Sequence, residues 1–310
     1  MGTPFAYFRG QFVPLSEAKI SIMTHAFNYG TGVFEGIRGN WNEEEGEIYL
    51  FRMADHYQRL RRSCRIMMIH LPYSDEDLYA ITTRLVELSG FQEDVYVRPM
   101  AYKSSEALGV RLHDLEDDFA IFVTPFGPYL DVERGARCCT SSWRRVEDTG
   151  IPARAKIIGI YVNSALAKTE ANLKGFDEAI MLDERGHVSE GSGENLFMVA
   201  DGKLYTPPPS DNILVGITRD TVIALAREEL GIETVERPID RTELYIADEV
   251  FLTGTAAHIT PVIELDHRPI GTGKRGPITA RLQGLYFQVI KGKHPKYRHW
   301  CTPCYSQVKR

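Results

Sequence analysis

One lysine and one carboxylate carry the strongest chemical signal in this sequence. Lys156 stands among aliphatic residues in the run 155–161, and Glu190 follows in the glycine-rich run 189–195. Burial among aliphatic groups disfavours the ammonium form of an amine and favours a nucleophile. Glycines let the chain turn tightly and bring a carboxylate against a flat ligand. Such a pair suits pyridoxal phosphate, which needs a Schiff-base lysine and an acid partner for its pyridine nitrogen.

Lys156 also has a simpler interpretation. Most lysines lie at the surface, and its stem could pack on a strand while its amine stays in water. Two further segments favour catalysis. The run 214–220 leads into apolar positions at helical spacing that end before Gly231, which predicts a helix with Thr218 as N-cap. A helix start can hold a phosphate, although an ordinary capped helix is more common. The small residues of 253–257 follow a strand-like stretch and could accept a second anion.

In these residues the chain resembles the branched-chain amino acid aminotransferases, fold-type IV pyridoxal-phosphate enzymes of the class IV aminotransferase family. The resemblance covers nearly the whole chain and follows the family's order. The glycine-rich run 189–195 is shared across fold type IV. The runs Tyr29–Arg38 and Tyr96–Pro99 indicate the branched-chain branch. The matching runs are Tyr29–Arg38, His56–Leu60, Tyr96–Pro99, Ser141–Arg145, Lys156–Tyr161, Ser189–Phe197, Gly216–Asp220 and Thr253–Ala257.

The resemblance implies cofactor roles for matched residues. Lys156 is expected to be catalytic, binding pyridoxal 5'-phosphate and moving the proton between the substrate α-carbon and the cofactor. Glu190 is expected to face the pyridine nitrogen and Tyr161 the ring hydroxyl. The phosphate is expected on Arg59, Gly216, Ile217, Thr218 and Thr255, and the remaining cofactor-lining residues are Gly193, Asn195 and Leu214.

The resemblance also implies a substrate site. Thr255 and Ala256 are expected to bind the α-carboxylate, with Tyr96 nearby. Arg98 is expected to meet the second carboxylate of glutamate or 2-oxoglutarate. The apolar pocket for a branched side chain is expected to comprise Tyr29, Phe34, Phe126 and Tyr129. In this family a loop of the partner subunit completes the pocket; here that loop includes Val110, so a homodimer is implied.

Some positions depart from the family pattern. Gly159-Ile160 stands where the family usually has Gly-Asn, and His258 where it often has Glu. These departures leave open a D-amino acid or (R)-amine transaminase of the same fold. Aminodeoxychorismate lyase, which shares the lysine and the glycine-rich run, is a weaker alternative. A non-catalytic relative is disfavoured because Lys156 and Glu190 are both intact.

Composition limits the other function classes. A net charge of -6 argues against nucleic-acid binding as a main task. The sequence has no apolar run of membrane-spanning length and no signal-peptide pattern at its start. Five cysteines, an odd number, indicate reduced thiols and a cytoplasmic location. Cys301 and Cys304 form a CxxC without a second pair, so no metal site is predicted. The basic tail 291–310 is expected to be solvated or loosely docked.

The pattern along the chain predicts an α+β protein with two domains. We expect a small α+β domain over 1–124, a linker over 125–136 where prolines and Gly127 break regular structure, and a large cofactor-binding domain over 137–310. The resemblance adds a barrel-like β core to the large domain. Expected elements include a hairpin at 5–13, a helix from Ser74 to Gly90, a strand over 155–162 and a last helix over 277–290.

Overall fold

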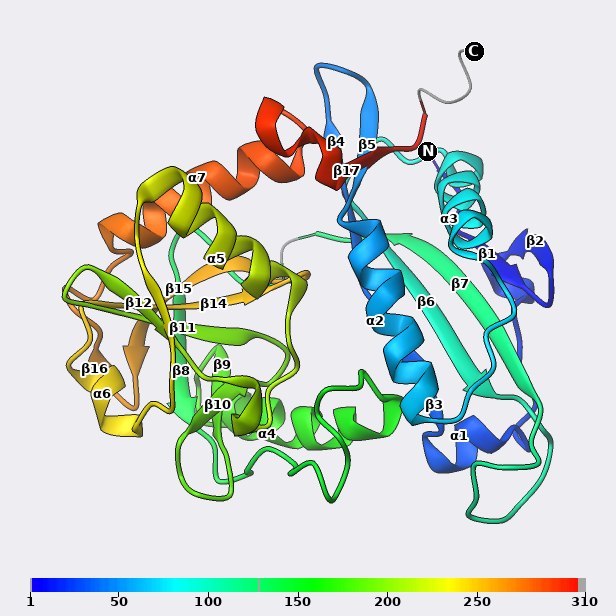
Figure 1. Cartoon of the computed structure of the whole chain (residues 1–310), viewed down its shortest axis with the longest axis horizontal. Helices are drawn as coiled ribbons and strands as arrows, with labels where there is room; N and C mark the ends of the chain where they lie inside the picture. Colours follow the sequence, from blue (N-terminus) through cyan, green and yellow to red (C-terminus); the bar gives the residue numbers. More distant parts are fainter. Residues whose placement is uncertain (1, 128, 306–310) are drawn as a thin grey trace. The chain divides into compact units, whose positions relative to one another are not determined.

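The computed structural model describes residues 2–127 and 129–305, and these form two compact units. The first unit comprises residues 1–127, 155–159 and 288–310, and the second comprises 128–154 and 160–287. Figure 1 follows the chain by colour. Lys156 belongs to the first unit through the short segment 155–159, although the sequence on either side belongs to the second. The domain borders expected at 124 and 136 stay a prediction.

An antiparallel sheet forms the centre of the first unit. Its strand order is β17-β5-β4-β6-β7-β1-β2, with β3 beside β6. The strands are β1 (Phe5–Phe8), β2 (Gln11–Pro14), β3 (Gly32–Phe34), β4 (Ile37–Asn42), β5 (Glu47–Phe51), β6 (Val95–Lys103), β7 (Asp117–Pro125) and β17 (Cys301–Pro303). The expected hairpin of β1 and β2 is confirmed.

Three α-helices accompany this sheet, α1 (His25–Tyr29), α2 (Met53–Ile66) and α3 (Asp75–Ser89), with 3-10 turns η1 (Leu15–Glu17) and η4 (Pro295–Trp300). Helix α3 packs against β1 and β7, and α2 packs against α3 and β3 (Figure 1). The prediction of α3 is confirmed by its ends: Ser74 and Asp77 form a capping box, and Gly90 ends the helix with φ 62°.

A nine-stranded sheet forms the centre of the second unit. Its order is β10-β9-β8-β15-β14-β11-β12-β13, with β16 beside β15. The strands are β8 (Ala136–Thr140), β9 (Glu178–Leu182), β10 (Val188–Gly191), β11 (Asn195–Ala200), β12 (Lys203–Thr206), β13 (Thr234–Glu236), β14 (Glu249–Gly254), β15 (His258–Leu265) and β16 (Arg268–Pro269). Strand β8 is parallel to β9 and β15, and β12 is parallel to β13; the other pairs are antiparallel.

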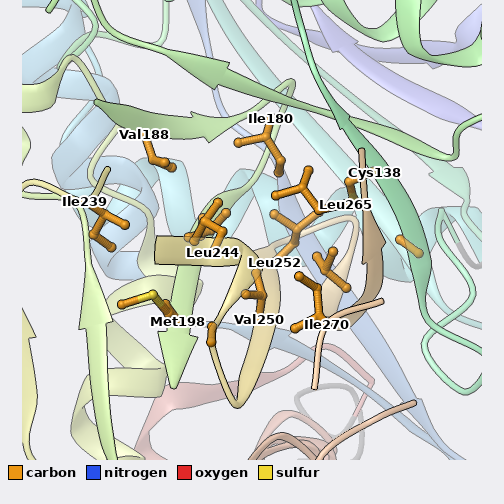
Figure 2. Close-up of a cluster of buried hydrophobic side chains, with 14 of the residues drawn as sticks. Cys138, Ile180, Val188, Met198, Ile239, Leu244, Val250, Leu252, Leu265 and Ile270 are labelled. Carbon is orange, nitrogen blue, oxygen red and sulfur yellow. The ribbon is translucent and has the colours of Figure 1, made fainter. Parts of the chain in front are cut away.

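The second unit has two buried apolar clusters, a larger one that includes Leu244 of helix α6 and a smaller one that includes Ala167 and Ala171 of helix α4. Figure 2 shows Ile180, Leu252 and Leu265 converging with Leu244 of helix α6. The helices and 3-10 turns are η2 (Ile158–Ile160), α4 (Tyr161–Leu173), η3 (Pro209–Asp211), α5 (Ile217–Leu230), α6 (Arg241–Tyr245) and α7 (Pro277–Ile290). The expected last helix is confirmed in α7. Within the described residues, the helices are too short or too polar to cross a membrane.

The segment around Lys156 differs from the strand expected over 155–162. Ile157 makes one isolated bridge to Val33, a 3-10 turn follows, and α4 begins at Tyr161. The cause is a close approach of two backbones. The N–H of Gly159 lies 3.3 Å from the carbonyl oxygen of Gly30, and a Cβ on Gly30 would lie 2.8 Å from the Gly159 Cα. Glycine at both positions lets the 3-10 turn of 158–160 pack against Gly30, and this turn interrupts the strand.

The expectation of a loosely docked C-terminal tail is wrong for residues 291–305. Strand β17 pairs with β5, and Tyr297 and Cys304 are each 2% exposed. The Glu47 carboxylate accepts the N–H groups of Cys304 and Tyr305 at 2.9 and 2.7 Å. Apolar burial at the sheet edge outweighs the basic character of the tail. Residues 306–310 lie outside the described part.

The CxxC motif is part of this packed tail. Cys301 and Cys304 are free and buried, and burial raises the pKa of both thiols. Raised thiol pKa values disfavour the reactive thiolate. The motif therefore packs as a pair of small apolar side chains.

Candidate active site

The backbone of Lys156 is anchored on both sides within the first unit. Its N–H donates to Ser63 Oγ at 3.1 Å, and its carbonyl oxygen accepts the Phe34 N–H at 3.0 Å. The flanking residues Ala155 and Ile157 are buried, and Lys156 itself is half-buried. Its Nζ lies 5.0 Å from the centre of the Phe34 ring. The amine is therefore presented against an aromatic face by a fixed backbone.

A buried carboxylate next to Phe34 fixes the predicted phosphate residue. Arg59 pairs with both oxygens of Glu35, Nε to Oε1 at 2.7 Å and Nη2 to Oε2 at 2.8 Å. His56 donates from Nδ1 to Oε2 at 2.7 Å. Burial acts to raise the pKa of Glu35, but Arg59 and His56 hold it well below its usual range. Arg59 is therefore oriented by a bidentate ion pair.

Neither Glu35 nor His56 received a role from the sequence. His56 and Arg59 are three residues apart on α2, so their side chains lie on one helix face. Glu35 directly follows the apolar strand residues Val33 and Phe34. An acid beside such an apolar run was the sequence signal that could have indicated a buried, functional carboxylate. Burial lowers the pKa of His56, which favours a neutral imidazole.

Four predicted substrate residues form one cluster. The Arg98 guanidinium lies 4.3 Å from the Phe34 ring centre and 5.0 Å from that of Tyr96, and the Tyr96 and Phe126 rings are 5.0 Å apart. Arg98 Nη2 donates to the Tyr96 hydroxyl at 3.1 Å, while its buried Nε has no hydrogen-bond partner. Gly36 is required here, since a Cβ would collide with that hydroxyl. Aromatic faces and a buried N–H donor therefore adjoin Lys156.

Tyr29 ends α1, and Val110 lies in the loop between β6 and β7. The Tyr29 hydroxyl accepts the Gly109 N–H at 3.2 Å, and His25 Nε2 lies 2.8 Å from the Gly109 carbonyl oxygen. These contacts join α1 to the loop 105–110. Val110 at the end of that loop is 91% exposed. Tyr29 therefore contacts the loop that carries Val110.

In the second unit, an ion pair and two hydrogen bonds hold the Glu190 carboxylate. Arg145 Nε forms an ion pair with Oε1 at 2.7 Å, and Oε2 accepts from Asn195 Nδ2 and the Leu214 N–H, both at 3.1 Å. Glu190 lies in strand β10 at a register irregularity after Val188, rather than on the glycine-rich turn itself. Such irregularities re-aim side chains. The turn is 192–194, where Gly193 is exposed.

The predicted phosphate-binding helix is α5, but its N-cap is Gly216 rather than Thr218. Gly216 has an extended backbone, and its carbonyl oxygen accepts the Asp220 N–H at 3.0 Å. A Cβ at this position would collide with Asn195 Oδ1, so only glycine fits. Asn195 Nδ2 also donates to the Leu214 carbonyl oxygen at 2.8 Å. Asn195 therefore joins the start of α5 to Glu190, and Ile217 and Thr218 lie in the first turn.

The remaining predicted residues of the second unit lie at element ends. Thr255 and Ala256 form the turn between β14 and β15. The nearby Thr253 Oγ1 is buried without a hydrogen-bond partner. Tyr161 opens α4. Tyr129 is 42% exposed, and Lys168 Nζ lies 4.9 Å from its ring centre.

Among the described residues, Asp183, His187 and Asp211 have the spacing of a metal site. A guanidinium of the chain already lies between the carboxylates: Arg185 Nη2 is 3.0 Å from Asp183 Oδ2 and 2.6 Å from Asp211 Oδ1. The acids therefore have a cation, and the group ties the β9–β10 turn to the segment before α5. The sequence-based expectation of no metal stays a prediction.

The two units carry complementary chemistry. The first presents an amine and a fixed guanidinium, and the second presents a carboxylate held by an ion pair and two N–H donors and the N-terminus of a 14-residue helix. Within each unit, these groups suit a part of pyridoxal 5'-phosphate: the amine suits its aldehyde, the carboxylate its pyridine nitrogen, and the guanidinium and the helix start a phosphate.

Comparison with known proteins gives the family. Residues 32–265 match the model of the family described as amino-transferase class IV. The chain belongs to the class IV aminotransferases, and the predicted α+β, two-domain, fold-type IV class is confirmed.

Similar proteins point to one branch of that family. A probable branched-chain-amino-acid aminotransferase of Aquifex aeolicus (strain VF5) is 52% identical over 98% of this chain and 97% of that protein. The branched-chain aminotransferase of Thermoproteus uzoniensis, solved with norvaline, has a TM-score of 0.93 and 47% identity and covers 98% of this chain and 100% of its own. The T.th. branched-chain amino acid aminotransferase, complexed with N-(5'-phosphopyridoxyl)-L-glutamate, has a TM-score of 0.91 and 41% identity, over 97% and 99%.

Proposed function

We propose that the protein transfers the amino group of L-leucine, L-isoleucine or L-valine to 2-oxoglutarate with pyridoxal 5'-phosphate as cofactor. The observation that carries this proposal is the cluster of Phe34, Tyr96, Arg98 and Phe126 beside Lys156. It combines aromatic surface for an aliphatic side chain with a buried N–H donor for a carboxylate. The relatives support it: one is solved with an aliphatic amino acid and another with a glutamate adduct.

The bound cofactor supplies an electron-withdrawing ring. Lys156 binds it and moves the proton at the substrate α-carbon, a general acid–base role. Glu190, held in place by Arg145 and two N–H groups, faces the pyridine nitrogen and keeps it protonated. Tyr161 hydrogen-bonds the ring hydroxyl.

Anion binding is divided among several groups. Arg59, fixed by Glu35, and the start of α5 with Ile217 and Thr218 hold the phosphate. Thr255 and Ala256 hold the substrate α-carboxylate through the turn after β14. Arg98 meets the second carboxylate of glutamate or 2-oxoglutarate, because an apolar pocket rejects a carboxylate unless a cation faces it.

The assembly is a homodimer formed through α1 and the loop 105–110. The backbone contacts of Ser105 and Gly109 with His25 make one continuous surface. Large apolar side chains are exposed on it: Ile22 80%, Met23 41%, Phe27 67%, Leu108 64% and Val110 91%. Exposed apolar patches of this kind mark protein–protein interfaces. Val110 and Tyr29 then contribute to the partner's substrate pocket. A cytoplasmic location belongs to the same proposal, supported by the five free cysteines.

The experiment is a spectral titration of the purified holoenzyme. L-Leucine bleaches the visible cofactor band, and 2-oxoglutarate restores it. D-Leucine and an (R)-amine are the comparison substrates. Bleaching by these compounds with no response to L-leucine would replace this proposal with a D-amino acid or (R)-amine transaminase. The absence of any response to amines would indicate a non-transaminase member of the fold.

A further inference from the structure

Arg145 is a buried cation to which the proposed function gives no contact with substrate or cofactor. It is 7% exposed and lies in the long loop between β8 and η2. Its N–H donates to the Leu182 carbonyl oxygen at 2.8 Å. The start of the loop is held by Glu170, which accepts the Ser141 hydroxyl at 2.6 Å. Asn163 Nδ2 donates to the Arg144 carbonyl oxygen at 3.0 Å. The guanidinium is thus carried by a backbone that is anchored from Ser141 to Arg145.

This guanidinium is directed at one oxygen of Glu190. Arg145 Nε lies 2.7 Å from Oε1, and both side chains are at least nine-tenths buried. The other oxygen, Oε2, is occupied by Asn195 and the Leu214 N–H. Four segments of the second unit therefore meet at one carboxylate.

We propose that Arg145 is a positioning residue that keeps the proton shared by Glu190 and the cofactor's pyridine nitrogen on the ring nitrogen. This inference rests on the proposed role of Glu190. A buried carboxylate without a cation is desolvated and competes for the proton. A cation beyond the carboxylate stabilises negative charge on Glu190 more than it disfavours the more distant positive ring, so the proton stays on the ring.

Arginine suits this role for two reasons. Its guanidinium remains charged at any pH that the enzyme meets, and its planar shape lets it approach a carboxylate edge closely. A lysine would place a strongly hydrated point charge on a different stem in the same buried space. The alternative role of Arg145 is structural neutralisation of a buried acid, which predicts loss of stability but no change in the ring proton.

The experiment follows the ring nitrogen directly, by nitrogen-15 NMR of holoenzyme reconstituted with cofactor labelled at that position. Arg145→Gln removes the charge and keeps an N–H donor. We expect the ring nitrogen of this variant to lose its proton at a lower pH than in the wild type, with Arg145→Lys between the two. We also expect cofactor affinity in Arg145→Gln to fall about 10-fold, because a ring nitrogen that loses its proton makes a weaker, no longer charge-assisted contact with Glu190. Arg144→Met, at the exposed neighbouring arginine, is the matched control and leaves both quantities unchanged.

The outcomes separate this inference from the function on which it rests. Glu190→Gln is measured in parallel; if it leaves the ring proton unchanged, the role of Glu190 itself fails. If Glu190→Gln shifts the ring proton but Arg145→Gln gives the wild-type titration, only the role of Arg145 is overturned. Should Arg145→Gln not fold, Arg145→Lys decides: a lower titration midpoint than wild type supports the inference, and an equal midpoint overturns it.

Discussion

Replacing Arg98 should separate the two halves of the catalytic cycle. The same pocket must accept an aliphatic side chain in one half-reaction and a carboxylate in the other. Arg98 faces Phe34 and Tyr96, and its buried Nε lacks a hydrogen-bond partner. Arg98→Met keeps an unbranched stem against Phe34 and removes only the guanidinium. The loss should therefore fall on the dicarboxylic substrate.

The magnitude follows from the contact that is lost. A hydrogen bond to a charged group contributes roughly 1.5–3 kcal/mol. Since about 1.4 kcal/mol corresponds to a factor of ten, the glutamate and 2-oxoglutarate half-reaction should slow about 10- to 100-fold. The leucine half-reaction should change less than about threefold, because its side chain has no charge to pair.

Single-turnover absorbance measurements of each half-reaction provide the test. Arg9→Met is the matched control, because Arg9 also stacks on a phenylalanine, 5.1 Å from the Phe8 ring centre, but is exposed. Equal losses in both half-reactions of Arg98→Met would refute the reasoning. They would mean that Arg98 serves the shared α-carboxylate or only supports the sheet.

Three further outcomes are expected. Lys156→Ala should abolish turnover, while an equilibrium binding measurement should still detect the cofactor through its phosphate; substantial activity without added amine would contradict the catalytic role. Light scattering should show a dimer that Val110→Glu dissociates, whereas Ile246→Glu, at a side chain 85% exposed in the second unit, should leave it intact. Burial, reinforced by the charge of Glu178, raises the pKa of Glu194 to about 8. The folded protein then keeps a proton that the unfolded chain releases near pH 4.5, so the free energy of unfolding should fall as pH rises across this interval. Thermal melting of cofactor-free Glu194→Gln at several pH values should show a smaller fall; an unchanged pH dependence would exclude this origin.

Local sequence patterns predicted those helices and strands whose ends are set by residues within the same segment. Helix α3 was predictable because Ser74, Asp77 and Gly90 act on backbone groups within one or two turns. The strand expected at 155–162 failed because Gly159 meets Gly30, a contact that no local pattern contains. The expectation of a loosely docked tail was wrong for the same reason, since the packing of the tail depends on contacts with the distant residue Glu47.

In the candidate site, too, the sequence predicted the functional residues but not their distant contacts. Motif resemblance selected Lys156, Arg59 and Glu190, but it did not supply the partners that fix them. Those partners lie far along the chain: Glu35 for Arg59, and Arg145 for Glu190. The expected place of Tyr29 in the pocket with Phe34 stays a prediction, and the structure adds a hydrogen bond from the Gly109 N–H to the Tyr29 hydroxyl.

The sequence by itself determined which groups can react, because an amine, a carboxylate and a guanidinium keep their chemistry wherever the chain places them. Only the tertiary structure decided their charge environment and orientation. A buried ion pair such as that of Glu190 with Arg145 depends on folding to remove water and to bring distant segments within hydrogen-bonding distance.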